Sequence, residues 1–168
     1  LIARGVENID GANALLRTVS NEMNNTQESD PVVSKDDLKD CSALIIGSPT
    51  HFGNMAAPMK AFLDTTTSEW YNGTLVGKPG GVFTSTSSLH GGQESTLLSM
   101  MLPLLHHGML ITGVPYTEKI LNSTKTGGTP YGPSHVSFNG ESEISEDEKN
   151  ICMNFGARIT KLAMKLEK

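Results

Sequence analysis

Two short polar loops carry the side chains best suited to hold a ligand. The first, residues 48–54, follows the apolar run 43–46, and the second, residues 84–92, lies at the end of the run 82–85. Such short runs are typical of strands buried in a parallel sheet, whose carboxyl ends meet at one edge. Both loops offer hydroxyls and backbone N–H groups with little charge. They suit a flat polar ring with carbonyl and N–H edges better than a bare phosphate, although most such loops bind nothing.

Several other kinds of site find no support in the sequence. Neither loop matches G-x-x-x-x-G-K-[ST] or G-x-G-x-x-G, and no G-x-S-x-G is present. The absence of these motifs disfavours ATP-type sites, classical dinucleotide sites and an α/β-hydrolase nucleophile. His106 and His107 are adjacent, and neighbours on a helix do not face each other, so we expect no metal site. No side chain stands out as a catalytic acid or base.

The elements that must position these loops alternate between strands and helices. The strand at 43–46 should stop at Pro49, which has no N–H to donate. The helix at 55–64 should have Asn54 as its N-cap and Pro58 in its first turn. The remaining predictions are a helix end at 1–8, a strand at 12–19, a polar loop at 20–34, a short helix at 34–40 capped by Ser34, and strands at 82–85 and 109–112.

Two longer helices complete the pattern. Residues 93–106 predict a helix bent at Pro103, with Leu97, Leu98, Met101 and Leu105 on its apolar face. A capping box at 145–148 opens the last helix, whose core-facing stripe comprises Ile151, Phe155, Ile159, Leu162 and Leu166. Between them, residues 113–143 are polar and rich in Gly and Pro, which is typical of a functional or interfacial segment. The alternation predicts one α/β domain spanning residues 1–168, with helices on both faces of a parallel sheet.

Composition limits the possible partners and compartments. The net charge is −5 and no large cluster of Lys and Arg occurs, which disfavours nucleic acid and anionic membranes. Cys41 and Cys152 are too few for a disulfide framework, and we expect both to be small buried hydrophobes. No apolar run approaches the length of a membrane span. We therefore expect a cytoplasmic protein.

Together these residues resemble the WrbA-type family of flavodoxin-like NAD(P)H:quinone oxidoreductases. The likeness runs from about residue 1 to 168 and rests on the segments 47–55, 62–64 with Trp70, 82–94, 106–109 and 127–132. It implies a three-layer α/β/α fold with a parallel sheet of order 2-1-3-4-5. It also implies FMN as cofactor, two-electron reduction of quinones by ping-pong hydride transfer, and a homotetramer built as a dimer of dimers. The competing class is a non-enzymatic electron carrier or regulatory binding protein, and the mild net charge favours the enzyme.

The resemblance also implies roles for individual residues. Trp70 would form an aromatic wall of the substrate pocket, and the alternative is a surface or interface aromatic. His106 would contact the flavin region from its own or a neighbouring subunit. The flavin ring would be held or lined by Thr50, His51, Phe52, Gly53 and Asn54 of the first loop and by Ser85, Thr86, Ser87, Ser88, Leu89, His90 and Gly91 of the second.

The sequence departs from the family in two places. The loop from Thr86 to Gly92 is one residue longer than usual, with Leu89 and His90 where small residues are common. The family's first strand and phosphate loop, roughly 20 residues, should precede Leu1. We expect the position of that strand to lie between residues 12–19 and 43–46, and the phosphate-binding residues cannot be named.

Overall fold

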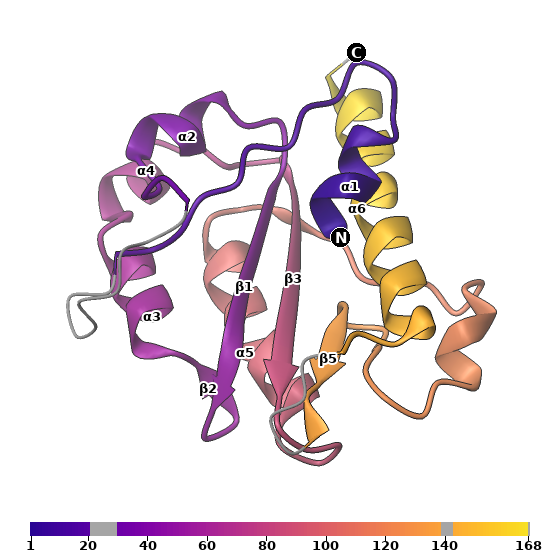
Figure 1. Cartoon of the computed structure of the whole chain (residues 1–168). Coiled ribbons are helices and arrows are strands. Elements are labelled where there is room, and N and C mark those ends of the chain that lie inside the picture. Colours follow the sequence, from indigo (N-terminus) through magenta and orange to yellow (C-terminus); the bar gives the residue numbers. More distant parts are fainter. Residues whose placement is uncertain (21–29, 139–142, 168) are drawn as a thin grey trace.

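Two long parallel strands, β1 (Leu44–His51) and β3 (Pro79–Thr86), form the centre of the sheet (Figure 1). Their register runs from Leu44 beside Gly80 to Pro49 beside Ser85. The computed structural model describes residues 1–20, 30–138 and 143–167 of the chain.

Three short strands complete the sheet among the described residues. β2 (Asn54–Met55) turns back antiparallel onto the end of β1. β4 (Leu110–Ile111) pairs in parallel with the start of β3, and β5 (Ser134–Val136) pairs in parallel with its end. β3 is therefore flanked on both sides, with β1 on one and the two short strands on the other.

Helices cover both faces of the sheet, and each face has its own hydrophobic core. Ile46 belongs to the core beneath α3 and α5, whereas its neighbour Ile45 packs against the core beneath α6. This alternation confirms the predicted three-layer α/β/α arrangement. One layer contains α1 (Ile2–Glu7), α6 (Glu146–Leu166) and the 3-10 helix η1 (Lys119–Asn122), and the other contains α2 (Lys35–Asp40), α3 (Ala57–Asp64), α4 (Thr67–Tyr71) and α5 (Gln93–His106).

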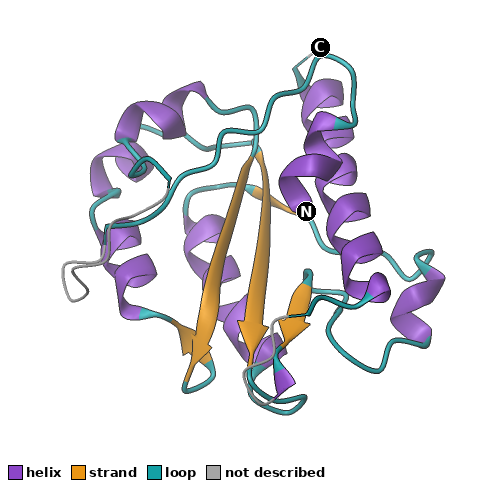
Figure 2. Ribbon diagram, in the orientation of Figure 1, coloured by secondary structure: helices purple, strands orange, loops and turns teal. Residues whose placement is uncertain are grey.

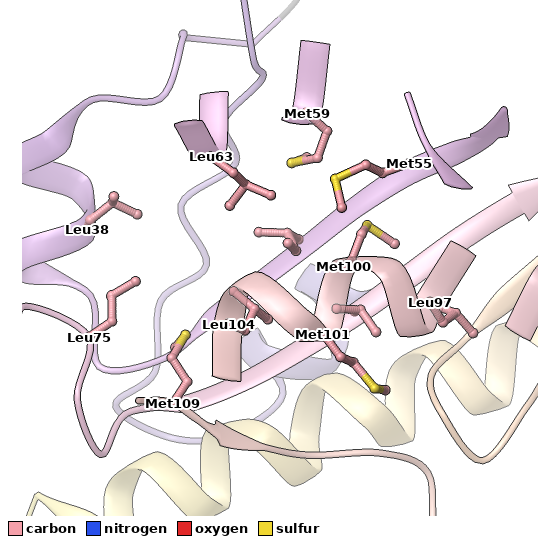
Figure 3. Close-up of a cluster of buried hydrophobic side chains, with 12 residues drawn as sticks. Leu38, Met55, Met59, Leu63, Leu75, Leu97, Met100, Met101, Leu104 and Met109 are labelled. Carbon is pink, nitrogen blue, oxygen red and sulfur yellow. The ribbon is translucent and has the colours of Figure 1, made fainter. Parts of the chain in front are cut away.

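The core beneath α3 and α5 is rich in methionine (Figure 3). Unbranched thioether side chains fill irregular gaps between elements that meet at several angles. Here they come from both sides of the interface between the two helices and the sheet: Met55, Met59, Met100, Met101 and Met109.

The predicted apolar face of α5 is partly wrong. Leu98 and Leu105 are 44% and 55% exposed, although both were expected in the core. The buried apolar residues lie three and four positions apart on a neighbouring face of the helix, and they are Leu97, Met100, Met101 and Leu104. On α6 the core-facing stripe ends at Ala163, because Leu166 is 50% exposed.

The helix boundaries confirm two predicted caps and correct a third. The side chain of Ser34 accepts from the Asp37 N–H, and Ser145 forms the predicted capping box with Glu148. Asn54 is not the N-cap of α3, because it pairs with β1 in β2 and the helix starts only after Ala56. Pro58 lies in the first turn, as predicted.

Pro49 does not end β1, which continues to His51. Proline is tolerated there because, in the described part of the chain, β3 is the only strand that pairs alongside Pro49. β1 therefore ends five residues beyond the predicted strand at 43–46 and two residues beyond Pro49.

The predicted strand at 12–19 is also wrong. Within it, Thr18 alone makes a bridge, to Val32, and the segment does not pair with β1. Direct pairing of residues 12–19 with β1 would have contradicted the predicted position of a further strand between them. No such pairing is observed among the described residues, so the further strand stays a prediction. Residues 21–29 of the predicted polar loop and 139–142 of the segment 113–143 lie outside the described residues.

Two glycines bring α1 into backbone contact with α6. A Cβ on Gly5 would overlap the Met153 carbonyl oxygen, and one on Gly156 would overlap that of Ile2. Helix α1 is thereby held against α6 in the same layer, and α6 packs on β3 through Phe155.

A single buried carboxylate organises the segment between β4 and α6. Glu148 accepts hydrogen bonds from the backbone N–H groups of Gly127, Ser145 and Val136 at 2.9, 2.8 and 3.0 Å. Its other contact is Nδ1 of His135, at 3.2 Å. Burial alone would raise the pKa of the Glu148 carboxyl, but the backbone donors outweigh it and lower the pKa.

We predict that Glu148→Gln destabilises the protein by about 2–4 kcal/mol at neutral pH, because the amide presents N–H groups to backbone N–H donors. A depressed pKa stabilises the fold above the ordinary value of 4.5, and this contribution is lost as pH falls through the folded-state pKa. Urea denaturation from pH 7 downwards should therefore show the difference shrinking in acid. The matched control is Glu146→Gln, because Glu146 is exposed and its side chain pairs with Lys149 on the helix surface. Equal losses in both variants would contradict the role of Glu148.

Candidate active site

The two loops named from the sequence lie together at the carboxyl edge of the sheet (Figure 2). Because Pro49 aligns with Ser85, Thr50 and Thr86 follow side by side at the ends of β1 and β3. The first loop is a hairpin turn between β1 and β2, and the second connects β3 to α5. The predicted cofactor residues from Thr50 to Asn54 and from Ser85 to Gly91 are thus brought to one edge.

The hairpin turn presents an aromatic ring to solvent. Phe52 has φ +52, a left-handed conformation that bulky residues rarely adopt, and its side chain is fully exposed. His51 and Asn54 on either side are also exposed. A strained backbone that holds an apolar ring in water is typical of a ligand-binding loop.

The two loops touch through their backbones. A Cβ on Gly92 would lie 2.8 Å from Cα of Gly53 and 3.1 Å from Oγ of Ser95. Gly92 also has φ +99, which L side chains rarely adopt. The contact leaves no room for a side chain at residue 92 and sets the distance between the loops.

Hydroxyl groups beneath the first loop join it to β3 and α5. The Thr96 hydroxyl donates to Thr50 Oγ1 at 3.1 Å, and the Thr84 hydroxyl donates to the Ser48 carbonyl at 2.8 Å. The Thr50 and Thr84 oxygens lie 3.3 Å apart. Thr84 and Thr96 are buried, and these bonds fix the rotamer of Thr50.

The second loop is held by its backbone carbonyls, which leaves its side chains free to meet a ligand. Thr86 Oγ1 donates to the Ser88 carbonyl at 2.7 Å, and Gln93 Nε2 donates to the Leu89 carbonyl at 2.8 Å. The side chains of residues 87–90 are exposed. Backbone anchoring with outward side chains fits recognition of a planar, uncharged ligand rather than a phosphate, since this loop carries no Lys or Arg.

Trp70 and His106 lie elsewhere. Both line a groove of about 470 Å³ between α4 and the end of α5, together with Lys60, Asp64, Leu102 and Pro103. Helix α5 starts at the second loop and ends at His106 after 14 residues, about 20 Å at 1.5 Å per residue. Within one chain, the structure therefore does not bring Trp70 or His106 to the two loops.

His107, for which the sequence predicted no role, is the buried histidine of this groove. Its Nε2 lies 2.9 Å from the Thr66 hydroxyl, whereas its Nδ1 is buried without a hydrogen-bond partner in the part of the chain that the structure describes. Burial lowers the pKa of His107, and the adjacent His106 lowers it further, against an opposing effect of Glu69. The sequence does contain a signal for the burial of His107. Residue 107 comes three positions after the buried Leu104 and therefore lies on the same face of the helix.

Two further features are absent from residues 1–20, 30–138 and 143–167. No group of three or more His, Cys, Asp or Glu side chains in these ranges could hold a metal ion. Within the same ranges, no helix has the length and apolar character needed to cross a membrane.

Comparisons with known proteins agree with this geometry. The family model described as NADPH-dependent FMN reductase matches residues 6–117. A protein from Geotalea daltonii named NAD(P)H dehydrogenase (quinone) is 39% identical over 181 aligned positions, which cover 98% of this chain and 88% of the relative.

Solved structures establish the flavodoxin-like fold. A flavodoxin, WrbA-like protein from Agrobacterium tumefaciens has a TM-score of 0.71 at 24% identity, covering 98% of this chain and 85% of its own. A flavodoxin from the domain Archaea has a TM-score of 0.51 at 20% identity, covering 79% and 72%.

We predict that Gly92→Ala is more damaging than Gly77→Ala, although both glycines have a positive φ. Gly77 has open space around a new Cβ, so its substitution should cost about 1–2 kcal/mol from backbone strain alone. Gly92→Ala should cost a further 1–3 kcal/mol, roughly, because the methyl group must push the loops apart. Equal changes in the urea midpoints of the two variants would show that the loops are not in contact.

Proposed function

Because this chain belongs to the NADPH-dependent FMN reductase family, we propose that it is a WrbA-type NAD(P)H:quinone oxidoreductase that reduces quinones by two electrons. FMN is its cofactor. The observation that carries the proposal is the parallel register of β1 and β3, which places two uncharged, hydroxyl-rich loops in contact at one sheet edge.

The residues present fit a flavin ring. A planar group with polar edges matches the exposed hydroxyls, the backbone N–H groups and the outward Phe52 ring of the loops. The loops contain no Lys or Arg, which also favours an uncharged ring over a phosphate. FMN supplies the site that accepts a hydride and passes electrons on. In this proposal the chain binds and shields that ring, with the first loop, from Thr50 to Asn54, holding it and the second, from Ser85 to Gly91, lining its edges.

We place nicotinamide and quinone in turn over the same exposed face of the ring, which gives a ping-pong order. The oxidised nicotinamide would have to leave before the quinone could bind, because both substrates would occupy the same place. Trp70 would form the aromatic wall of that shared pocket, and His106 would contact the flavin region. Since both line the groove at the end of α5 that lies away from the loops of their own chain, we assign these contacts to a neighbouring subunit.

An exposed apolar stripe on α5 supports a homotetramer built as a dimer of dimers. Leu98, Leu102 and Leu105 are 44%, 61% and 55% exposed and recur at helical spacing on one face. They continue towards Trp70, which is itself half exposed beside the groove. We further propose a cytoplasmic location, which the two free cysteines, Cys41 and Cys152, support.

We predict repeated turnover when purified protein is mixed with FMN, excess NADH or NADPH, and benzoquinone. An enzyme oxidises many equivalents of nicotinamide per chain, because the quinone regenerates the oxidised flavin after each cycle. A non-enzymatic electron carrier or regulatory protein would oxidise at most one equivalent. Nicotinamide absorbance followed against bound-flavin concentration separates the two, and a stoichiometric burst without turnover would refute the proposal.

We also predict that Leu105→Glu lowers the oligomeric state and reduces quinone turnover while FMN binding is retained. The charge would have to be buried in the proposed interface, whereas the flavin loops lie at the other end of α5. Light scattering measures the mass, and flavin fluorescence measures binding. Leu166→Glu is the control, because Leu166 is 50% exposed on a different face. A strictly monomeric wild type at micromolar concentration would rule out the tetramer.

A further inference from the structure

We propose that Gln93 and Thr96, on one face of the first turn of α5, are positioning residues that fix the two flavin loops relative to each other. The inference rests on the proposed function, because it assigns the loops to FMN. Both side chains are buried, at 5% and 0% exposure, and each makes its bond to a different loop.

The hydrogen bonds of Thr96 have only one consistent direction. The Thr96 proton goes to Thr50 Oγ1, and the Thr84 proton goes to the Ser48 carbonyl. A hydroxyl has a single proton, so Thr50 must donate to Thr84 across the 3.3 Å that separate their oxygens. The resulting series of hydrogen bonds starts at the Thr96 hydroxyl on α5 and passes through Thr50 of the first loop to Thr84 of β3 and the Ser48 carbonyl of β1.

Gln93 performs the matching task for the second loop. Its Nε2 donates to the Leu89 carbonyl at 2.8 Å, while its Oε1 accepts from the Ser134 hydroxyl at 2.5 Å. The Ser134 oxygen in turn accepts from the Gly128 N–H at 2.8 Å. The Oε1 atom of Gln93 is thus fixed by Ser134 of β5, so Nε2 is the atom that faces the second loop and donates to it.

The two residues are three positions apart on a rigid helical turn, which links the loops mechanically. A site whose loops are already fixed loses less conformational entropy when a rigid ring binds. Removal of either side-chain bond would free the Leu89 carbonyl or the Thr50 hydroxyl from its helix partner and allow its loop to move. Gln93 and Thr96 need not touch the cofactor to affect its affinity.

The test compares Thr96→Val, which removes the hydroxyl but keeps the shape, with Thr96→Ser, which keeps the hydroxyl. Thr160→Val is the matched control, because the buried Thr160 hydroxyl donates to the Gly156 carbonyl within α6. We expect Thr96→Val to raise the Kd for FMN about ten-fold, the size of effect that follows from one buried hydrogen bond. Thr96→Ser and Thr160→Val should stay within about two-fold of wild type, even if Thr160→Val lowers the Tm.

A second comparison tests whether the two residues act together. Gln93→Met should also raise the Kd for FMN. In the double variant the Kd should rise by less than the product of the two single fold-changes, because either substitution alone already loosens the arrangement of the two loops. Quinone kinetics of the FMN-saturated variants should show a raised KM with Thr96→Val that Thr96→Ser restores.

The possible failures are distinguishable. Wild-type protein that binds FMN, with a Thr96→Val variant that binds equally well, would overturn the positioning role alone. A Thr160→Val variant that weakens FMN as much as Thr96→Val would reduce the role to general stability and overturn it too. Strictly multiplicative effects in the double variant would overturn the link between the loops. Wild-type protein that binds no FMN would overturn the proposed function and this inference together.

Discussion

The parallel pairing of β1 with β3 is the constraint on which the candidate site depends. Both faces of β3 are covered: Val82 is fully buried beneath α5, and a Cβ on Gly81 would overlap Phe155 and Ile159 of α6. A shift of one residue would exchange these two faces and place a valine against α6, so the register cannot change without loss of both cores. The positions of the two loops at the sheet edge are therefore set by the packing of residues deeper in the sheet.

Buried polar groups hold the segment between β4 and α6 in place, as the hydrophobic cores hold the sheet. The segment between β4 and α6 contains little regular structure, yet Glu148 satisfies three of its backbone or capping N–H groups. Glycines in the same segment allow close approach, since a Cβ on Gly132 would overlap the Val82 carbonyl. The motif at 127–132 is thus explained by packing against β3 and α6, and its glycines are needed even where no ligand is bound.

The sequence predicted those features that depend on local chemistry and missed those that depend on tertiary contacts. The capping boxes at Ser34 and Ser145, the bounds of α5 and the carboxyl-edge location of both loops were recoverable because each has a local signal. The extension of β1 past Pro49 was not, since it depends on which side of the strand is paired. Nor could the sequence separate Trp70 from the loops or identify His107, because both facts follow from how α4 packs on the end of α5.

Helix α5 connects the two loops, the methionine-rich core and the groove, because each part of the helix contacts one of them. Its first turn bonds to both loops, its middle fills the methionine-rich core, and its last turn borders the groove that contains His107. The inner face is fully occupied by these contacts, whereas Leu98, Leu102 and Leu105 on the outer face remain exposed. A rigid helix that is fixed along its inner face keeps the groove at one end of α5 and the loops at the other. A ring bound at the loops can therefore meet the aromatic and histidine side chains of a groove only if a second subunit supplies that groove.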